Sequence, residues 1–369
     1  MRIVLVLGSS TGGIGAHVRD LARFLVREGH QVVVAGPAET GERFDFTGAN
    51  GGDARAASAT AIKFVPVAIS AAPHPARDLA AVRTLRKLAR HADVVHAHGV
   101  RAGSLTRLAL PLLPGSPRSV VTLHNAMLAT GNRARLLEVL ERLAVCRADQ
   151  VLGASEDLVA RARELGARQV MLGPVPAPAL APPTRTRARV RAEFGLDPDR
   201  PLLLAVGRLA PQKAYPVLLA ALARLDVESK PLLVIAGDGP LEAELAALIE
   251  ESGVEARLLG RRDDIADLLA AADVFVLSSD WEARALVVQE AMRAGLPVLA
   301  TRVGGIPELV GEAAVLVPPD NPGAFARALA AILDDPAEQQ RLRRTALDQA
   351  ATWPTAAAAL ALVLAAYRA

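Results

Sequence analysis

Cysteine is almost absent from this sequence, since Cys146 is the only one in 369 residues. A single cysteine excludes an intramolecular disulfide framework, and nothing in that count demands an oxidising compartment. Long hydrophobic runs are also missing. The most apolar helix expected, Ala356 to Tyr367, is too short to cross a bilayer, and Met1 leads directly into a strand without a secretory leader. These absences predict a cytoplasmic protein.

Aromatic residues are scarce as well, at 3% of the chain, and the net charge is only +3. A nucleic-acid-binding protein needs its positive charge on one face with interleaved aromatic side chains, so this composition argues against nucleic acid as a partner. Cationic residues do gather on one expected helix, which indicates either a solvated face or a peripheral contact with anionic lipid at the inner face of the membrane. They are Arg77, Arg83, Arg86, Lys87 and Arg90.

Strand-like hydrophobic runs alternate with helix-length segments along the whole chain, which is the pattern of parallel sheets covered by helices. The expected strands of the first half are residues 2–7, 31–35, 61–67, 93–96, 119–123 and 150–152. Those of the second half are residues 201–206, 231–236, 256–259, 273–277, 297–300 and 313–317. Residues 41–58, rich in Gly, Asp and Thr, are expected to form a surface loop. The fold class predicted is α/β, with two Rossmann-like doubly wound domains.

A proline-rich seam separates the two halves. Five prolines lie between Gly173 and Pro183, and they exclude a helix and favour a stiff extended linker. We therefore predict an N-terminal domain over residues 1–174, a second domain over 175–353 and a terminal helix over 354–369. Ligands of open α/β sheets bind at the carboxyl ends of the strands, so the site is expected in a cleft between the domains.

Two glutamates eight positions apart are the most informative feature of the chain. Glu282 falls in the turn after the strand 273–277, and Glu290 falls inside the helix that follows Ala285. An ionised carboxylate accepts hydrogen bonds from several hydroxyls and donates none, so the pair suits a ligand rich in hydroxyls, such as a nucleotide sugar. A solvated turn and a solvated helix face would explain the same residues without any ligand.

The segment from Glu282 to Glu290, with its flanks 291–301 and 304–308, resembles the Glu-x7-Glu motif of retaining glycosyltransferases of family 4, the glycosyl transferases group 1. The resemblance implies the GT-B fold, in which two Rossmann-like domains face each other across a cleft and the last helix crosses back to the N-terminal domain. It also implies that Glu282 binds sugar hydroxyls and Glu290 the ribose. One departure is visible, because Ala283-Arg284-Ala285 stands where the family has a glycine-containing stretch.

The loop Gly207 to Lys213 follows the first strand of the second half and resembles the diphosphate clamp of that family. Arg208 and Lys213 are then implied to neutralise the charge that grows on the departing nucleoside diphosphate, as a divalent metal does elsewhere. A solvent-facing basic turn is the alternative. The backbone N–H groups of Leu286 and Val287, at a helix start, are implied to add to the phosphate site. No Asp-x-Asp motif of metal-using transferases is apparent, so we expect neither a metal nor another cofactor.

Turns rich in glycine complete the implied donor site. Gly12 and Gly13 join the first strand to the first helix, where backbone N–H groups can approach phosphate oxygens, although dinucleotide enzymes use such turns too. Asp238 and Arg261 follow two further strands and resemble nucleoside-binding loops, while Asp238 could equally cap the next helix. Backbone contacts carry little base specificity. UDP- and GDP-sugars are favoured as donors, but the sequence does not separate them from ADP-sugars.

Histidines follow two expected strands of the first half. His124 comes after the strand 119–123, where the family often has a histidine close to the transferred sugar, so the resemblance implies that it stabilises the oxocarbenium-like state. A neutral imidazole that ties the strand end to its loop is the alternative. His96 and His98 have an alternating spacing that suits a metal, but no third ligand lies nearby in the sequence, which favours a structural or acceptor-side role.

Together these motifs predict a retaining glycosyltransferase that moves a sugar from a nucleotide-diphosphate donor to an unidentified acceptor hydroxyl, on a lipid, a small molecule or a glycan. The N-terminal domain is assigned to the acceptor and the second domain to the nucleotide sugar. A 2-epimerase-like GT-B enzyme and a non-catalytic nucleotide-sugar-binding protein are alternatives. A short-chain dehydrogenase is disfavoured because no Tyr-x-x-x-Lys is present, with Leu219 four positions after Tyr215.

Overall fold

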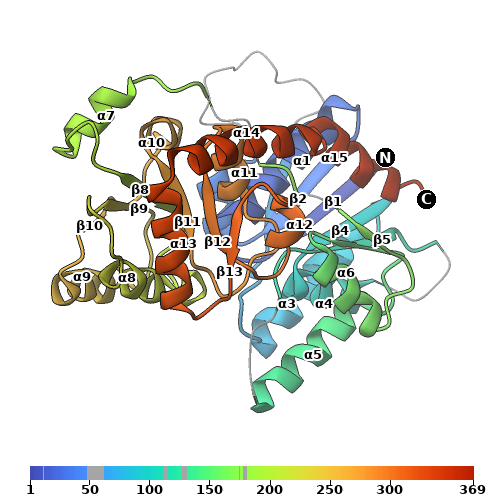
Figure 1. Ribbon diagram of the computed structural model, residues 1–369. Helices are drawn as coiled ribbons and strands as arrows, with labels where there is room; N and C mark the ends of the chain where they lie inside the picture. The colour runs from blue at the N-terminus through green and yellow to red at the C-terminus, as the bar shows by residue number, and fades with distance from the viewer. Residues whose placement is uncertain (11, 48–61, 111–114, 127–130, 174, 178–180) are drawn as a thin grey trace. The chain divides into compact units, whose positions relative to one another are not determined.

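The computed structural model describes the chain from Met1 to Ala369, except residues 11, 48–61, 111–114, 127–130, 174 and 178–180 and the side chains of residues 131–133. The described residues form two compact units. One is Met1–Pro176 together with Pro354–Ala369, here called the N-terminal unit, and the other is Ala177–Trp353, the C-terminal unit. Each unit is built on one open parallel sheet (Figure 1). Residue 174, the predicted end of the first domain, lies outside the described residues.

The N-terminal sheet has seven strands in the order β3-β2-β1-β4-β5-β6-β7, and all neighbouring strands are parallel. They are β1 (Arg2–Leu7), β2 (Gln31–Gly36), β3 (Lys63–Pro66), β4 (Val94–His98), β5 (Arg118–Leu123), β6 (Gln150–Gly153) and β7 (Val170–Leu172). Central strands such as β1 are apolar at successive positions because helices cover both faces of the sheet.

The helices of this unit are α1 (Gly13–Arg27), α2 (Ala38–Phe44), α3 (Pro75–Ala89), α4 (Val100–Ala109), α5 (Gly131–Val145), α6 (Glu156–Glu164) and α15 (Ala356–Ala366). The helix α2 corrects the prediction of a loop over residues 41–58, and residues 48–58 lie outside the described part of the chain. Gly41 is a packing residue, because a Cβ atom there would lie 2.5 Å from the ring of Phe64. The sequence pattern at this glycine indicated a loop, whereas the glycine lets α2 approach the neighbouring strand β3 closely.

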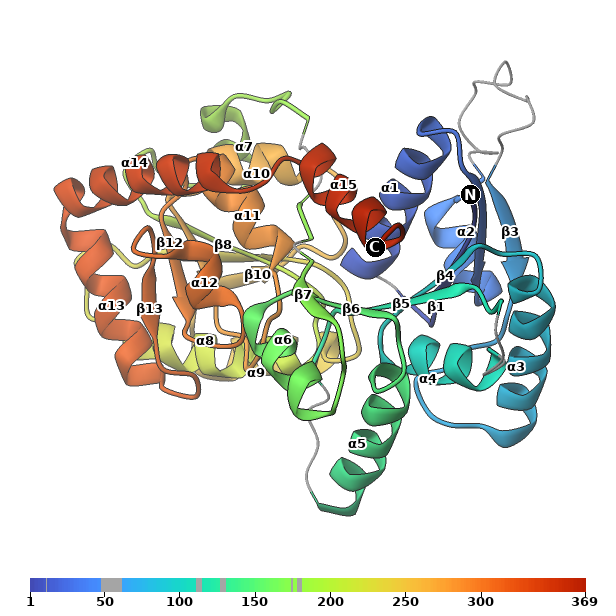
Figure 2. The ribbon, with the colours of Figure 1, turned by 90° about the vertical axis from the view of Figure 1, so that its right-hand side faces the viewer.

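The helix α15 belongs to the N-terminal unit although it ends the chain. It lies beside α1 in both views of the ribbon (Figures 1 and 2), and Leu360 and Val363 share a buried core with β1 and α1. Just beyond it, the Tyr367 hydroxyl lies 2.7 Å from His96 Nδ1, and Arg118 Nε donates to the carbonyl oxygen of Ala366 at 2.8 Å. The predicted return of the last helix to the N-terminal domain is therefore confirmed.

Residues 336–366 form one stretch that is long and apolar enough to cross a membrane by length and composition alone. The stretch is divided, because α14 ends at Thr352 and α15 begins at Ala356. The two helices also belong to different units. We therefore describe the stretch as two packed helices.

The C-terminal sheet has six strands in the order β10-β9-β8-β11-β12-β13, again all parallel. They are β8 (Leu202–Val206), β9 (Leu232–Ala236), β10 (Ala256–Leu258), β11 (Val274–Leu277), β12 (Val298–Thr301) and β13 (Val315–Val317). Its two faces bury separate cores, since Leu202 and Leu204 belong to one cluster while Leu203 and Ala205 belong to the other. This alternation is the signature of a doubly wound sheet with helices on both sides.

The helices of the C-terminal unit are α7 (Arg187–Glu193), α8 (Tyr215–Ala223), α9 (Glu242–Ser252), α10 (Ile265–Ala271), α11 (Leu286–Arg293), α12 (Ile306–Val310), α13 (Pro322–Asp334) and α14 (Pro336–Thr352), with one 3₁₀ turn, η1 (Pro211–Lys213). All twelve expected strands are present, with ends within two residues of the predicted ones. The strand β7 was not predicted, because three residues beside the proline-rich seam carry no periodic signal.

Candidate functional site

The strand order of the C-terminal sheet reverses between β8 and β11, and hydrogen bonds join the loops that follow these two strands. Gln212 Nε2 donates to the carbonyl oxygen of Trp281 at 2.6 Å, and the backbone N–H of Asp280 donates to the carbonyl oxygen of Gln212 at 2.9 Å. Ser278 Oγ also donates to the carbonyl oxygen of Lys213 at 2.8 Å. The two loops therefore form one framework at the point where open α/β sheets bind ligands.

This framework brings together Lys213 and Glu282, which the sequence predicted separately. Lys213 Nζ donates to Glu282 Oε1 at 2.6 Å, and Ser279 Oγ donates to the same oxygen at 2.7 Å. The lysine and glutamate side chains are 16% and 12% exposed, so the pair is largely removed from water and its charge-assisted hydrogen bond is strong. Ser279 was not predicted, because a serine near a turn is too common to carry a signal.

The backbone of Glu282 is fixed as firmly as its carboxylate. Its carbonyl oxygen accepts a hydrogen bond from the backbone N–H of Gly305 at 2.8 Å. A Cβ atom at Gly304 would lie 2.0 Å from that oxygen, and Gly304 has a φ of 48°, so glycine is required there. The carboxylate is therefore presented by a rigid turn.

The other predicted groups of the clamp and the nucleoside loops lie on the ends of β8, β9 and β10. The side chains of Arg208, Asp238 and Arg261 are exposed, and none makes a hydrogen bond or ion pair with another residue in the described ranges. Their loops are held by backbone, since the N–H of Leu209 donates to the carbonyl oxygen of Asp238 at 2.8 Å. A Cβ atom at Gly237 would lie 1.9 Å from the carbonyl oxygen of Gly207, which explains the bare backbone at this contact.

Glu290 lies on α11 and is half-buried, as the sequence pattern placed it inside a helix. Burial raises the pKa of its carboxyl to about 7, and Arg293 opposes the shift. Leu286 and Val287 are the first two residues of this helix, and no side chain caps it. Their backbone N–H groups are among those that have no partner within a helix and can meet an anion.

The departure from the family pattern, residues 283–285, is packed into the unit. Ala283 and Ala285 are buried, and the Arg284 side chain is only 8% exposed. Arg284 Nη1 lies 3.6 Å from Glu308 Oε1 on α12, while Arg284 Nε is buried and has no hydrogen-bond partner in the described structure. Burial lowers the pKa of this guanidinium, and Glu308 opposes the shift. The arginine thus connects the turn of Glu282 to α12.

In the N-terminal unit, Gly12 and Gly13 lie at the start of α1. Gly12 is the residue before the helix, both glycines are exposed, and no side chain caps the helix from position 12. Ser10 Oγ accepts a hydrogen bond from the backbone N–H of Gly15 at 3.0 Å. Residue 11 of the same turn lies outside the described residues.

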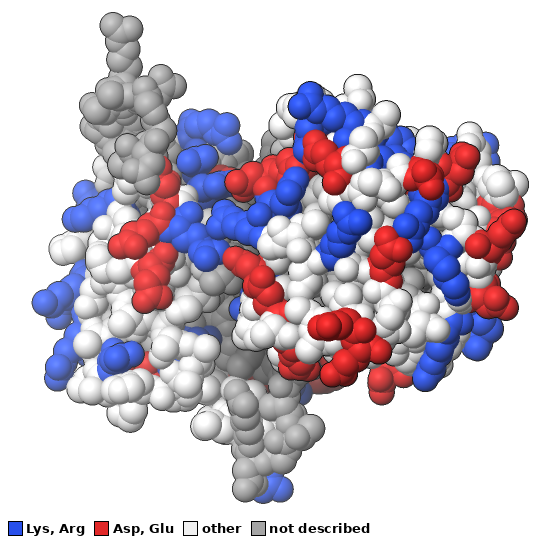
Figure 3. All heavy atoms as spheres, turned by 90° about the vertical axis from the view of Figure 1, so that its left-hand side faces the viewer, with Lys and Arg blue, Asp and Glu red and all other residues white. Residues whose placement is uncertain are grey.

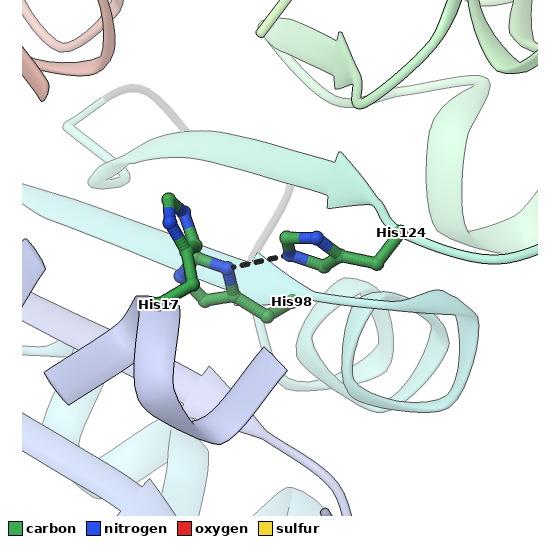
Figure 4. A group of neighbouring side chains, drawn as sticks. All are labelled: His17, His98 and His124. Atoms are coloured by element: carbon green, nitrogen blue, oxygen red, sulfur yellow. Dashed lines mark hydrogen bonds between the residues drawn. The ribbon is translucent and has the colours of Figure 1, made fainter. Parts of the chain in front are cut away.

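Three histidine rings gather at the carboxyl edge of the N-terminal sheet (Figure 4). His98 ends β4, His124 follows β5, and His17 comes from α1; each is more than 90% buried. His98 Nδ1 lies 3.1 Å from His124 Nε2. The site is again the point where the strand order reverses, here between β1 and β4.

The position of His17 corrects one step of the sequence reasoning. A third imidazole does lie beside His98, but it comes from a helix about eighty positions earlier in the chain, where no local spacing could reveal it. His96 has a different environment, since its Nδ1 lies 2.7 Å from the Tyr367 hydroxyl and its Nε2 lies 2.7 Å from Thr122 Oγ1. His96 is therefore a structural residue with both ring nitrogens paired.

Burial keeps all of these imidazoles neutral. It lowers the pKa of His17 to about 4 and that of His96 to about 3. It also holds the pKa values of His98 and His124 well below the usual range, with a further lowering from the neighbouring histidines. The N-terminal edge thus offers neutral ring nitrogens.

Charged residues of both signs are interspersed over the face of the molecule drawn in Figure 3. The exposed cationic residues of α3 include Arg86, which donates hydrogen bonds to the carbonyl oxygens of Leu108 and Ala109 at 3.1 Å each. This arginine caps the C-terminal end of α4. The predicted alternative of a solvated helix face thus includes one residue with a structural contact.

Comparison with known proteins identifies families for both halves of the chain. Residues 12–178 match the model of the glycosyl transferase 4-like domain, and residues 186–349 match that of the glycosyl transferases group 1. A curated relative, the D-inositol 3-phosphate glycosyltransferase 2 of Catenulispora acidiphila, is 34% identical over 73% of this chain and 69% of its own length. Two other curated relatives, the N-acetyl-alpha-D-glucosaminyl L-malate synthase of Bacillus anthracis and a D-inositol 3-phosphate glycosyltransferase, are matched over 64% and 66% of their lengths, so the chain spans about two thirds of such relatives.

Solved structures share the fold. The sucrose-phosphate synthase of Thermosynechococcus elongatus superposes with a TM-score of 0.81 at 23% identity, over 100% of this chain and 98% of the other. Anabaena Alr3699/HepE, solved in complex with UDP-glucose, gives 0.79 at 20% identity and 99% coverage of each chain. These matches confirm the predicted pair of Rossmann-like domains. The chain therefore belongs to the group 1 glycosyltransferases, with the family 4 type of GT-B fold.

Proposed function

We propose that this protein is a retaining glycosyltransferase that transfers a sugar from a UDP- or GDP-sugar to an acceptor hydroxyl, with no metal at the diphosphate. The observation that carries the proposal is the Lys213–Glu282 pair at the reversal point of the C-terminal sheet. A carboxylate for sugar hydroxyls and an ammonium for phosphate oxygens lie in direct contact there, and a donor carries both kinds of partner.

The donor site is assembled from the loops around this pair. Glu282 accepts hydrogen bonds from sugar hydroxyls, Glu290 binds the ribose diol, and Arg208 and Lys213 bind the diphosphate with the backbone N–H groups of Leu286 and Val287. Gly12 and Gly13 contribute backbone N–H groups to the diphosphate, and Asp238 and Arg261 belong to the nucleoside loops. UDP is the preferred nucleotide in this proposal because Alr3699/HepE, which has the same fold, was solved with UDP-glucose.

Transfer in this proposal follows front-face attack. The bond between the anomeric carbon and the leaving phosphate oxygen breaks, the acceptor oxygen bonds to the same face of that carbon, and the acceptor proton passes to the departing phosphate. Negative charge grows on the diphosphate as the bond breaks, so the cationic groups stabilise the transition state more than the ground state. His124 donates a hydrogen bond that stabilises the sugar cation, as the family resemblance implies.

The acceptor is assigned to the N-terminal unit. We propose a cytoplasmic location, with a peripheral contact to anionic lipid through the exposed cationic residues of α3. Salt-dependent binding to vesicles with and without anionic lipid tests that contact.

The decisive experiment supplies the purified chain with UDP-, GDP- and ADP-sugars and a panel of small-molecule, lipid and glycan acceptors. We expect one donor to raise the melting temperature, one acceptor to be glycosylated, and the product to keep the anomeric configuration of the donor, as read by NMR. The same transfer should persist after treatment with a chelator.

Other outcomes would each replace the proposal. Conversion of the donor to its 2-epimer without any acceptor would identify an epimerase, and donor binding without turnover would identify a binding protein. An inverted product would overturn the retaining mechanism.

A further inference from the structure

The side chains of His17, His98 and His124, here called the histidine triad, converge on a common point (Figure 4). Their ring centroids form a nearly equilateral triangle, with separations of 5.4 Å for His98–His124, 5.5 Å for His17–His124 and 5.8 Å for His17–His98. One ring nitrogen from each residue lies within 4.8 Å of the other two. Because His98 Nδ1 and His124 Nε2 are only 3.1 Å apart, the nitrogens lie closer together than the rings.

These dimensions match those of a metal centre. A tetrahedral zinc ion holds imidazole nitrogens at about 2.0–2.1 Å, which keeps the nitrogens about 3.3–3.4 Å apart and the ring centroids about 5.2 Å apart. The observed nitrogen contact of 3.1 Å lies close to that separation. The centroid separations exceed the expected value of about 5.2 Å by a few tenths of an ångström, and the His17 nitrogen, which lies within 4.8 Å of the other two, would have to move closer on binding.

The hydrogen bonding of the triad is incomplete as well. The His17 ring makes no hydrogen bond with any residue in the described ranges. His96, two residues before His98 on the same strand, has both of its ring nitrogens paired at 2.7 Å. The His17 imidazole therefore offers a ring nitrogen with no partner beside the His98–His124 pair, and a neutral imidazole nitrogen can bind an ion.

The chemistry of the triad selects the kind of ion. Imidazole nitrogens suit Zn²⁺, Cu²⁺ and Ni²⁺ rather than Mg²⁺ or Ca²⁺, which prefer oxygen ligands. Three histidine ligands would leave a fourth position of a tetrahedral ion open for water or a hydroxyl group.

We propose that the histidine triad binds one Zn²⁺ ion through His98 Nδ1, His124 Nε2 and a ring nitrogen of His17. All three ligands come from the N-terminal unit, and the proposed transfer does not require the ion.

The test is zinc binding to the full, untagged chain after removal of metal with a chelator. We expect about one equivalent of Zn²⁺ to bind by calorimetry, and Co²⁺ substituted for it to give the intense visible absorption of a tetrahedral nitrogen site. The variants His17→Gln and His98→Gln should each weaken Zn²⁺ binding at least about 10-fold. His91→Gln, which changes an exposed histidine on the same unit, should leave binding unchanged.

A second measurement uses the wild-type protein alone, so it remains informative if the variants do not fold. X-ray absorption of the zinc-loaded wild-type protein should show imidazole scattering from about three ligands. The proposal is overturned if zinc does not bind, if the folded His17→Gln and His98→Gln variants bind it as tightly as the wild type, or if the absorption spectrum shows mainly oxygen ligands. These measurements need neither donor nor acceptor. The zinc site can therefore be confirmed even if the proposed transferase activity is not found, and the activity can be confirmed even if zinc does not bind.

Discussion

The two units have the same architecture but place opposite chemistry at the same topological position. At the β8/β11 reversal of the C-terminal sheet, the side chains are charged and paired, as in Lys213 with Glu282. At the β1/β4 reversal of the N-terminal sheet, they are buried imidazoles held neutral by their surroundings. The doubly wound sheet fixes where ligands can bind, while the residues in the loops decide which chemistry occurs there.

The largest effect on activity should come from the charged residues at the β8/β11 reversal of the C-terminal sheet, here called the charged edge. Replacing Lys213 with alanine removes a cation whose contact strengthens as charge develops on the leaving diphosphate, and we expect kcat for transfer to fall about 100- to 1000-fold. Arg208→Ala should act in the same direction, while Glu290→Ala should mainly raise KM for the donor. Steady-state kinetics with a saturating acceptor measures each effect.

Lys63→Ala serves as the matched control, since Lys63 is exposed on β3 of the other unit and should leave kcat unchanged. Unaltered kinetics in the Lys213, Arg208 and Glu290 variants would show that these charged residues take no part in catalysis. The chemical difference between the two units would then have no functional meaning.

Acid should destabilise the N-terminal unit more than the C-terminal unit. The unfolded chain binds protons on histidine below about pH 6.5, whereas the folded pKa values of His17 and His96 are about 4 and about 3, so the N-terminal unit loses stability as the pH falls through this window. We expect a loss of at least about 2 kcal/mol of unfolding free energy between pH 7 and pH 5. Urea unfolding followed by far-UV circular dichroism measures it.

A convenient internal control exists, because both tryptophans, Trp281 and Trp353, lie in the C-terminal unit. Tryptophan fluorescence therefore reports on that unit alone. If the fluorescence transition moves to lower urea concentration as much as the circular dichroism transition does, acid sensitivity does not reside in the histidines.

Rising pH should lower the stability of the C-terminal unit through Glu290. Burial raises the folded pKa of this carboxyl to about 7, above its unfolded value of 4.5, so the folded state binds more protons and stability falls as the pH rises through that window. Glu290→Gln removes the titration. Allowing for partial exposure, we expect the variant to gain about 1 kcal/mol over the wild type at pH 8 relative to pH 4.5.

Tryptophan fluorescence during urea unfolding at the two pH values reads this difference. Glu244→Gln, at an exposed position on α9, should show the same stability difference at both pH values. If the stability difference between Glu290→Gln and the wild type is the same at both pH values, the Glu290 carboxyl is solvated in the folded protein.

The smallest effect concerns Ala214, which follows the clamp lysine. It has a φ of 45°, a left-handed conformation that an L side chain resists by about 1–2 kcal/mol. Part of the relief from Ala214→Gly is offset by the extra freedom of glycine in the unfolded chain, so we expect a gain of up to about 1 kcal/mol. Thermal unfolding checks this value, and Ala220→Gly, inside α8, should instead destabilise the unit.

The strands and the charged edge could be predicted because their signals are local. A buried run such as residues 202–206 is apolar over consecutive positions, and Glu282 and Glu290 lie within one strand-turn-helix segment. The strand β7 has three residues and no such signal. The glycines within residues 41–58 suggested a loop, whereas Gly41 serves packing within a helix.

The histidine triad and Ser279 could not be predicted for a different reason. His17 meets His98 and His124 only when three separate segments come together at the sheet edge, so the arrangement exists in the fold and in no spacing along the chain. Ser279 is a hydroxyl whose importance depends on which carboxylate oxygen it reaches. Local patterns predicted where the edges lie, and tertiary packing determined which side chains meet there.

The pairing of Tyr367 with His96 joins the last residues of the chain to the centre of the first sheet. The N-terminal unit is therefore made of two separate stretches of sequence, and during synthesis its second stretch leaves the ribosome only after the entire C-terminal unit. The unit that is translated first is consequently the last to be completed, and until then its sheet lacks the helix that covers β1 and α1.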